Sequence, residues 1–203
     1  YAHGLNSTPE IIITKKLNGS QNWTVWHKDL TSVNYFLYLN TTASEANGVG
    51  TAFNSGISST LVGIGNSGLV NDSLNYITYA FHSVDGYSKI GSYNGSNSPI
   101  SIITGFRPAF LMVKRTNTAT SNWLIIDSAR VTGSGADALY PNSSAAESSS
   151  WNTSFDSNGF TISSNEAWLS VSGGEYIFMA FAEEGAPIVT RNATNPFGDS
   201  SEQ

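Results

Sequence analysis

The sequence predicts an all-β protein of two tandem β-sandwich units, of jelly-roll or concanavalin-like character, that arose by internal duplication. Three observations support this fold class. The composition favours strands and turns, short apolar runs end at turn residues, and four motifs recur in the same order about a hundred residues apart. Each unit then has a size at which a sandwich can bury its own core.

The composition suits strands better than helices. Of the 203 residues, 39% are hydrophobic, 12% are aromatic and only 12% are charged, about half of the roughly 25% charged residues usual in soluble domains. Polarity comes from Ser, Thr and Asn, whereas long solvated helices need Lys, Glu, Ala and Leu. Five Trp, nine Tyr and ten Phe supply enough apolar surface for a packed core, which argues against intrinsic disorder.

Charge and cysteine content exclude several classes of protein. A net charge of −6 with nine Lys and Arg provides no basic stripe for nucleic acid. The chain has no Cys, which excludes a disulfide framework and thiolate metal sites. No apolar run approaches the roughly 18 residues of a membrane-spanning helix. Because the chain opens at Tyr1 without Met or a signal-peptide pattern, we expect a processed product or one segment of a longer polypeptide.

An internal repeat organises the chain. Four motifs of the first half recur in the second half in the same order, at offsets of 99 to 102 residues. Because chance is a poor explanation for four ordered matches, we expect a first unit over residues 1–85, a second over 86–184 and a polar tail or linker over 185–203. The matched segments are 9–16 with 108–115, 22–23 with 122–123, 37–42 with 139–144, and 76–81 with 176–181.

Each copy is predicted to consist mainly of strands. Short apolar runs at 11–14 and 110–113 follow a Pro and end at a basic pair. Runs of that length, rich in β-branched or aromatic residues, are typical of buried strands. The next strands are expected at 23–26 and 123–126, after turn-like residues.

Two further strands are expected late in the second copy. Asn158-Gly159 predicts a hairpin turn into a strand at 160–162. Gly173-Gly174 then leads into a final strand at 176–181, which has aromatic residues at alternating positions.

One helical feature is expected in both copies. The segments 42–45 and 144–147 match the capping box, in which a hydroxyl and a carboxylate satisfy the exposed N–H groups at the start of a helix. We therefore predict a single helical turn at each segment.

A strand is also expected between the copies, at 86–95. Polar and apolar residues alternate there, and Asn94-Gly95 predicts a turn. This strand is predicted to open the second unit. The first unit has no equivalent, because only eight residues precede Pro9. We expect the missing strand to lie upstream in a longer parent chain or to come from a neighbouring subunit.

Several blocks of the sequence together resemble a repeat of structural proteins from tailed bacteriophages, especially marine ones. The blocks are His3-Gly4-Leu5 with 9–13, 22–27, 39–43, 86–93, 105–110 and 173–181. They cover both copies, from about His3 to Glu184. The resemblance implies a non-enzymatic virion component in which β-sandwich units are strung in series along a tail-fibre or capsid-surface protein, with no catalytic residues to carry over.

The function expected on this basis is that of a bacteriophage virion structural protein, a tail-fibre, tail or capsid-decoration component in the extracellular particle. The expected partners are further copies of the chain, in a homo-oligomer such as a trimer, and other virion proteins, with host-surface glycans as a further contact. Neither nucleic acid nor membrane insertion is expected. Two alternatives stay open: a secreted carbohydrate-binding, lectin-like module that works as a monomer, and a glycan depolymerase with two convergent carboxylates.

The titratable residues form no recognisable catalytic or metal-binding motif. The histidines His3, His27 and His82 lie far apart and lack metal-ligand spacing. We therefore predict no catalytic residue, no metal and no cofactor, and we expect Asp127 to form a structural salt bridge or turn contact with Arg130. The carboxylates that a depolymerase could use form no recognisable pair; they are Asp127, Asp156, Glu166, Glu175, Glu183 and Glu184.

Trp168 and Trp151 are the candidate binding residues. They align with Gly68 and Phe53 of the first copy. Trp168 is thus the best candidate for an exposed aromatic ring that stacks on a sugar or packs against another subunit, and a partly buried loop position is the alternative. Aromatic residues shared by both copies are expected in the core: Trp23 and Trp123, Tyr76 and Tyr176, Phe81 and Phe181.

Overall fold

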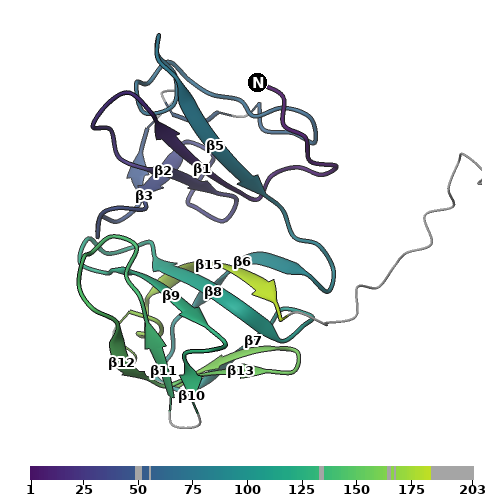
Figure 1. Ribbon diagram of the computed structural model, residues 1–203, viewed down its shortest axis with the longest axis vertical. Coiled ribbons are helices and arrows are strands. Elements are labelled where there is room, and N and C mark those ends of the chain that lie inside the picture. Colours follow the sequence, from purple (N-terminus) through teal and green to yellow (C-terminus); the bar gives the residue numbers. More distant parts are fainter. Residues whose placement is uncertain (49–51, 55, 133–134, 164–165, 167, 184–203) are drawn as a thin grey trace, which may run out of the picture.

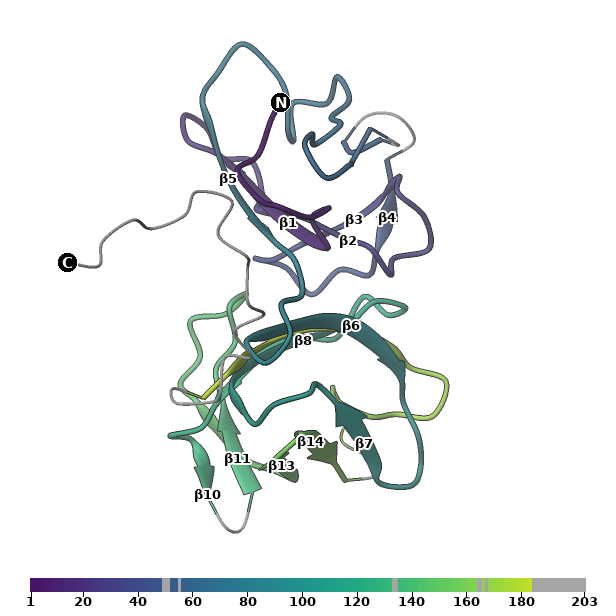
Figure 2. The same ribbon diagram turned by 90° about the vertical axis from the view of Figure 1, so that its right-hand side faces the viewer.

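The computed structural model describes residues 1–48, 52–54, 56–132, 135–163, 166 and 168–183. Over these residues the chain is all-β and contains no helix. Antiparallel strands form four sheets. Along the long axis, the five-stranded sheet lies above the four-stranded sheet, and the two three-stranded sheets lie together below it (Figures 1 and 2). The described chain accordingly has no helix long and apolar enough to cross a membrane.

The first half of the chain contributes a five-stranded antiparallel sheet. Its strand order is β4-β3-β2-β1-β5, and Figure 2 shows β5 and β4 at its two edges. The strands are β1 (Ile11–Lys16), β2 (Thr24–His27), β3 (Tyr35–Tyr38), β4 (Ala46–Asn47) and β5 (Tyr76–Phe81).

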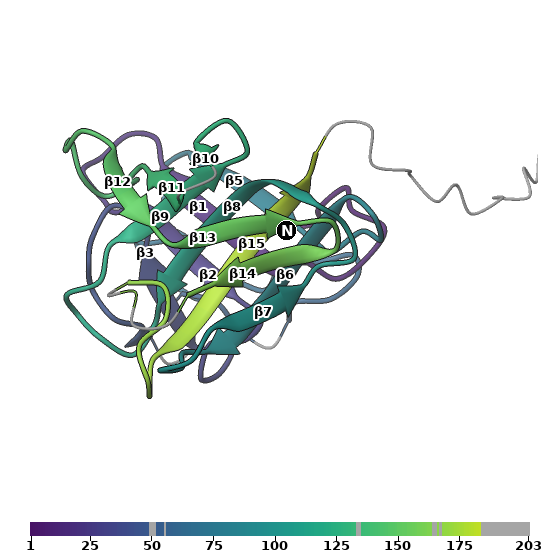
Figure 3. The same ribbon diagram turned by 90° about the horizontal axis from the view of Figure 1, so that it is seen from below.

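The second half contributes a four-stranded sheet and two smaller ones. The four-stranded sheet has the order β6-β15-β8-β9, and the three-stranded sheets have the orders β10-β11-β12 and β13-β14-β7. Figure 3 looks at the three-stranded sheets from below. The strands are β6 (Ser88–Asn94), β7 (Ile100–Ile103), β8 (Pro108–Arg115), β9 (Trp123–Asp127), β10 (Val131–Thr132), β11 (Gly135–Ala138), β12 (Ser148–Trp151), β13 (Thr153–Asp156), β14 (Gly159–Ile162) and β15 (Glu175–Ala182).

Three apolar layers lie against the faces of the two large sheets. The lower layer lies between the four-stranded sheet and the two three-stranded sheets, and includes Phe155 and Phe178. The upper layer lies between the five-stranded sheet and the loops that follow it, and includes Trp26 and Phe53. The middle layer, which includes Met112, joins the two large sheets face to face. Each large sheet is therefore buried on both faces.

Burial on both faces explains the continuous apolar runs. Side chains alternate between the faces of a strand, so Ile11 and Ile13 enter the middle layer whereas Ile12 enters the upper layer. In β8, Met112 enters the middle layer and its neighbours Leu111 and Val113 enter the lower layer. The prediction of buried strands from these runs is confirmed.

The large sheets of the two halves have matching strand registers. Ile12 lies opposite Ala80 in the first half, and Leu111 lies opposite Ala180 in the second. The residues of the second pair follow those of the first by 99 and 100 positions. The pairs between β1 and β2 correspond in the same way to those between β8 and β9: Ile11 with His27 and Phe110 with Asp127, Ile12 with Trp26 and Leu111 with Ile126, Ile13 with Val25 and Met112 with Ile125.

The halves differ in what covers these sheets on the outside. In the second half, β7 pairs with β14 and β14 pairs with β13. In the described part of the first half, the same positions hold only isolated bridges, Ala2 with Leu61 and Phe53 with Ile64. The first half therefore covers its sheet largely with loops.

The strand predicted between the copies is present as β6, which pairs with β15 along its whole length. The predicted strand at 160–162 and its hairpin turn are also confirmed as β14 and its pairing with β13. Within the described residues no strand lies on the corresponding free edge of β5. Only Trp123 and Tyr176 are fully buried, whereas Trp23, Tyr76, Phe81 and Phe181 are half-buried, which corrects the expectation that all six shared aromatic residues are in the core.

The predicted helical turns at 42–45 and 144–147 are wrong, because both segments lack regular secondary structure. In a capping box the carboxylate would bond back to the first residue of the turn. Instead, Glu45 accepts a hydrogen bond from the backbone N–H of Thr31 at 3.1 Å, and Glu147 pairs with Arg130 at 3.0 Å. These tertiary contacts of the carboxylates leave the capping box unformed.

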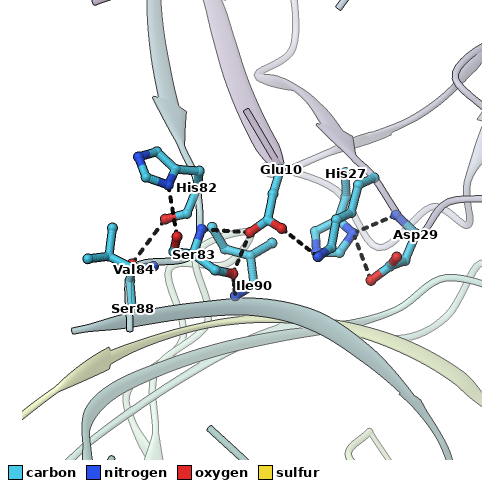
Figure 4. A network of polar contacts seen from close by, with 9 residues as sticks. Glu10, His27, Asp29, His82, Ser83, Val84, Ser88 and Ile90 are labelled. Carbon is cyan, nitrogen blue, oxygen red and sulfur yellow. Dashed lines mark hydrogen bonds and ion pairs between the residues drawn. The ribbon is translucent and has the colours of Figure 1, made fainter. Parts of the chain in front are cut away.

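The connector between the halves is held by a polar network (Figure 4). The carboxylate of Glu10 accepts hydrogen bonds from the Ser83 N–H at 2.6 Å and from the Ser83 hydroxyl, and pairs with Lys28 at 2.7 Å. The Ser83 hydroxyl oxygen in turn accepts the Ile90 N–H at 3.0 Å. Glu10 thus ties β1 of the first half to the beginning of β6 in the second.

Candidate functional site

An aromatic cluster lies on the second half of the chain. The ring of Trp168 stacks on that of Trp151, with centroids 5.5 Å apart and planes 30° apart. Tyr140 meets Trp168 edge-on, with ring centroids 5.7 Å apart. The two tryptophans that the sequence singled out are therefore in direct contact.

The local chain geometry fixes Trp168 in this cluster. The backbone carbonyl of Glu166 accepts the N–H groups of Leu169 and Ser170 at 3.1 and 2.9 Å, which forms a tight turn around Trp168. The carboxylate of Glu166 accepts the backbone N–H of Asn152 at 3.2 Å and its side-chain amide at 2.7 Å. The turn that holds Trp168 is thereby tied to the residue next to Trp151.

The two tryptophans differ in exposure. Trp151 is only 8% exposed, and its indole Nε1 is buried without a hydrogen-bond acceptor among the described residues. Trp168 is half-buried and packs on the lower layer. Trp168 and Tyr140 can therefore present ring surface to a ligand, with Trp151 as their support. A flat apolar face with polar neighbours can stack on a sugar ring.

In the first half, Phe53, which the sequence aligns with Trp151, is fully buried in the upper layer and forms an isolated bridge with Ile64.

The turn that contains Trp168 has a counterpart in the first half, one position away from the one that the sequence alignment gives. Its hydrogen bonds, from Leu169 and Ser170 to Glu166, match those from Val70 and Asn71 to Ser67. The counterpart of Trp168 is therefore Leu69 rather than Gly68, and the aromatic cluster has no counterpart among the described residues of the first half.

A second candidate site is a cleft between the two halves, with a volume of about 270 Å³. Three carboxylates line it: Asp29 and Glu45 come from the first half, and Glu175 from the second. The backbone closes the cleft on one side, because Glu45 N–H bonds the Thr116 carbonyl at 2.9 Å and Thr116 N–H bonds the Glu175 carbonyl at 2.8 Å. Sequence analysis missed Asp29 and Glu45, which lie 146 and 130 residues from Glu175, respectively, and share no motif with it.

The remaining carboxylates considered for hydrolysis are engaged elsewhere. Asp127 forms an ion pair with Arg130, as predicted. Asp156 accepts hydrogen bonds from the hydroxyl groups of Ser154 and Thr161 at 3.1 and 2.7 Å, beside the turn that joins β13 to β14. The others are Glu166, bound to Asn152, Glu183, paired with Arg107, and Glu184, which lies outside the described residues.

His27 is buried beside the acidic cleft. Its Nδ1 accepts the N–H of Asp29 at 3.1 Å, which leaves the proton of the neutral ring on Nε2. That nitrogen faces the backbone of Phe178 without a hydrogen bond of ordinary geometry. Burial lowers the pKa of His27 to about 4, and the carboxylate of Asp29 opposes this effect only in part. His27 is therefore a neutral buried residue near neutral pH.

No group of three or more His, Asp or Glu in the described structure could hold a metal ion. His3 bonds the carbonyl of Ser58 at 3.0 Å. His82 bonds the carbonyl of Ser83 at 2.8 Å. These contacts are typical of structural histidines.

The fold and these sites define an all-β protein of stacked antiparallel sheets, with an aromatic cluster on its second half and an acidic cleft between its halves. Residues 1–185 match the family model of a domain of unknown function, DUF7483, and the chain belongs to this family. No curated protein and no solved structure gives a significant match.

Proposed function

We propose that the chain is a non-enzymatic structural module of a tailed-bacteriophage virion, as part of a tail fibre, a tail or the capsid surface. In this proposal an internal duplication produced two tandem β-sandwich units, at 1–85 and 86–184, and the first later lost most of its outer strands. The matching registers of the two large sheets support the duplication.

The observation that carries the proposed function is the middle apolar layer. It joins the large sheets of the two halves face to face, so consecutive units form one continuous stack instead of separate domains on a flexible linker. Such a stack suits an extended particle component that must keep its shape. Hydrogen bonds that join the halves at this layer include Trp123 Nε1 to the Tyr38 carbonyl at 2.9 Å, Lys114 Nζ to the Thr42 carbonyl at 3.4 Å, and Glu45 N to the Thr116 carbonyl at 2.9 Å.

Quantitative mass spectrometry of purified particles from the phage that encodes the chain tests this proposal. We expect the chain in the particle at a fixed, repeated copy number relative to the major capsid protein. Its recovery only from the lysate, with none in the particles, would contradict a virion role. Light scattering after size exclusion tests the associated partner proposal, a homo-oligomer such as a trimer.

A second candidate function is carbohydrate binding, which the cluster of Tyr140, Trp168 and Trp151 favours. A glycan on the host surface would then be the ligand within the virion proposal. In the lectin-like alternative the same cluster would act on a secreted monomer.

In the depolymerase alternative, the acidic cleft would be the active site. Its carboxylate Glu45 is already bonded by both the N–H and the hydroxyl of Thr31, which favours a structural role. Release of reducing sugar from phage-host polysaccharide by the intact chain, lost in Glu175→Gln, would contradict the non-enzymatic proposal.

A further inference from the structure

The two large sheets differ at one edge. In the second half, β6 covers the edge of β15 and pairs from Ser88 to Asn94. The counterpart of β15 is β5, and its outer edge has no partner strand in the described chain. The strand register establishes this correspondence, because Ile11 pairs with Phe81 as Phe110 pairs with Phe181.

The free edge of β5 is unusually suited to pairing. Natural edge strands are commonly kept from pairing by short length, charges or proline. The other edges of the large sheets follow this rule: β4 has two residues, β6 carries Lys89 and β9 ends at Asp127. By contrast, β5 has six residues, Tyr-Ile-Thr-Tyr-Ala-Phe, with no charge and no proline.

Backbone hydrogen bonds show which groups of β5 point outward. Leu17 N–H bonds the Asn75 carbonyl at 2.9 Å, so Asn75 faces β1. Because the two sides of an antiparallel strand alternate, the N–H groups of Tyr76, Thr78 and Ala80 face the free edge. Three donors are therefore available for an added strand.

The covering strand of the second half also fills a side-chain site. Tyr93 of β6 lies parallel to Tyr176 of β15, with ring centroids 4.9 Å apart and planes 2° apart. Its hydroxyl donates to the carbonyl of Leu169 at 2.8 Å. Tyr93 thus links the edge strand to the turn that precedes β15.

The first half has a groove at the corresponding place. It has a volume of about 330 Å³ and lies beside Tyr76, the counterpart of Tyr176. Val70, which the turn hydrogen bonds identify as the counterpart of Leu169, lines the same groove. Its other lining residues are Tyr1, Ile64, Asn71, Asp72, Leu74 and Thr78. Apolar side chains such as Val70 and Leu74 and polar ones such as Asn71 and Thr78 line the groove together, which suits the apolar ring and polar hydroxyl of a tyrosine.

We propose that β5 and this groove form an acceptor site for an extended, tyrosine-bearing strand donated by a partner protein. A second copy of this chain is not the donor, because its own tyrosine-bearing strand β6 is already paired with β15. The donated strand pairs antiparallel with β5 and places a tyrosine on Tyr76, as β6 places Tyr93 on Tyr176. This is strand addition at a sheet edge, in which main-chain hydrogen bonds supply affinity and one side-chain site supplies specificity. The inference concerns a binding surface and does not depend on the virion proposal.

A labelled peptide with the sequence of residues 86–95 is the direct probe, because it carries β6 and its tyrosine. We expect saturable binding by fluorescence anisotropy, with hydrogen-exchange protection of the amides of Tyr76, Thr78 and Ala80. The same peptide with Tyr93→Ala should bind at least tenfold more weakly, because it leaves the groove empty.

Two chain variants supply the matched control. Thr78→Pro removes an outward N–H, and we expect at least a tenfold loss of peptide affinity. Thr78→Ser keeps both that N–H and the side-chain hydroxyl, so its affinity should fall far less than that of Thr78→Pro. If Thr78→Pro does not fold, as judged by circular dichroism, the Tyr93→Ala peptide still tests the groove.

Three outcomes would overturn the proposal. The first is no saturable binding of the wild-type peptide. The second is exchange protection on β15 in place of β5, which would indicate displacement of β6. The third is self-association of the chain through β5, abolished by Thr78→Pro, which would make a second copy the occupant.

Discussion

Trp123 of the second half donates its indole N–H to the carbonyl oxygen of Tyr38 in the first half, at 2.9 Å. Both groups lie where the two large sheets meet, and Trp123 is almost fully buried. The hydrogen bond thus fixes the position of one half on the other as well as contributing packing.

We expect Trp123→Phe to lower the free energy of unfolding by about 1–3 kcal/mol, because it removes the indole donor to the Tyr38 carbonyl and part of a fully buried side chain. Trp23→Phe is the matched control, since Trp23 occupies the same place in the first half but is only half-buried. Urea unfolding followed by fluorescence measures both. Equal losses in the two variants would show that the contact between the halves has no special role.

His27 makes stability depend on pH. Burial lowers its pKa in the folded chain from 6.5 to about 4, so between these values the unfolded chain binds the proton more strongly. The contribution of the neutral histidine is complete above pH 6.5 and is lost as pH falls toward 4, a difference on the order of 3 kcal/mol. His27→Gln should flatten the curve of unfolding free energy in this window, and parallel curves for the two proteins would contradict the assignment.

Lys114 gives a second pH dependence, at alkaline pH. It is buried between the large sheets, where its ammonium group bonds the carbonyls of Arg115 and Thr42. Burial lowers its pKa from 10.5 to about 8. The unfolded chain therefore holds this proton more strongly between pH 8 and 10.5, and stability from this group should rise across that range. We expect Lys114→Met to remove the rise, measured by unfolding at pH 8 and 10, while Lys15→Met retains it.

Glu10 holds the connector in place. Partial burial alone would raise its pKa, but hydrogen bonds from Lys28 and Ser83 lower the pKa below its ordinary value. We expect Glu10→Gln to increase hydrogen exchange at the Ile90 amide, because Ser83 loses its anchor. Glu183→Gln is the control, since its ion pair with Arg107 is exposed and such pairs contribute little. Unchanged exchange at Ile90 would argue that the network is dispensable.

Trp168→Ala tests the aromatic cluster. We expect it to abolish binding on a glycan array while circular dichroism and the unfolding midpoint show a folded chain. Tyr87→Ala removes a different exposed ring, 53% exposed, and should leave binding unchanged. Binding that survives Trp168→Ala, or loss of fold in that variant, would defeat the role of Trp168 as a ligand contact.

The strands were predictable where local sequence and tertiary burial agree. The runs around Ile12 and Leu111 are apolar on both faces, and each is covered on both faces. The capping-box prediction failed because Glu45 and Glu147 find partners about 14 and 17 residues away in sequence, which a four-residue motif does not reveal.

The candidate sites were only partly predictable for a related reason. Trp151 and Trp168 stood out by comparison between the copies, although their contact depends on the turn at Glu166. The acidic cleft brings Glu175 near Asp29 across the boundary between the halves. No local pattern encodes that proximity, because it arises only when the two large sheets pack.

The middle layer also determines how the chain should unfold. If either half came apart alone, it would leave Ile11, Ile13 or Met112 and their neighbours in water on the half that remained. The cost of wetting that face couples the two halves, so calorimetry should record one cooperative transition with equal calorimetric and van't Hoff enthalpies. A longer array built on the same plan would be weakest at its terminal units, since only there is one large sheet without a neighbour.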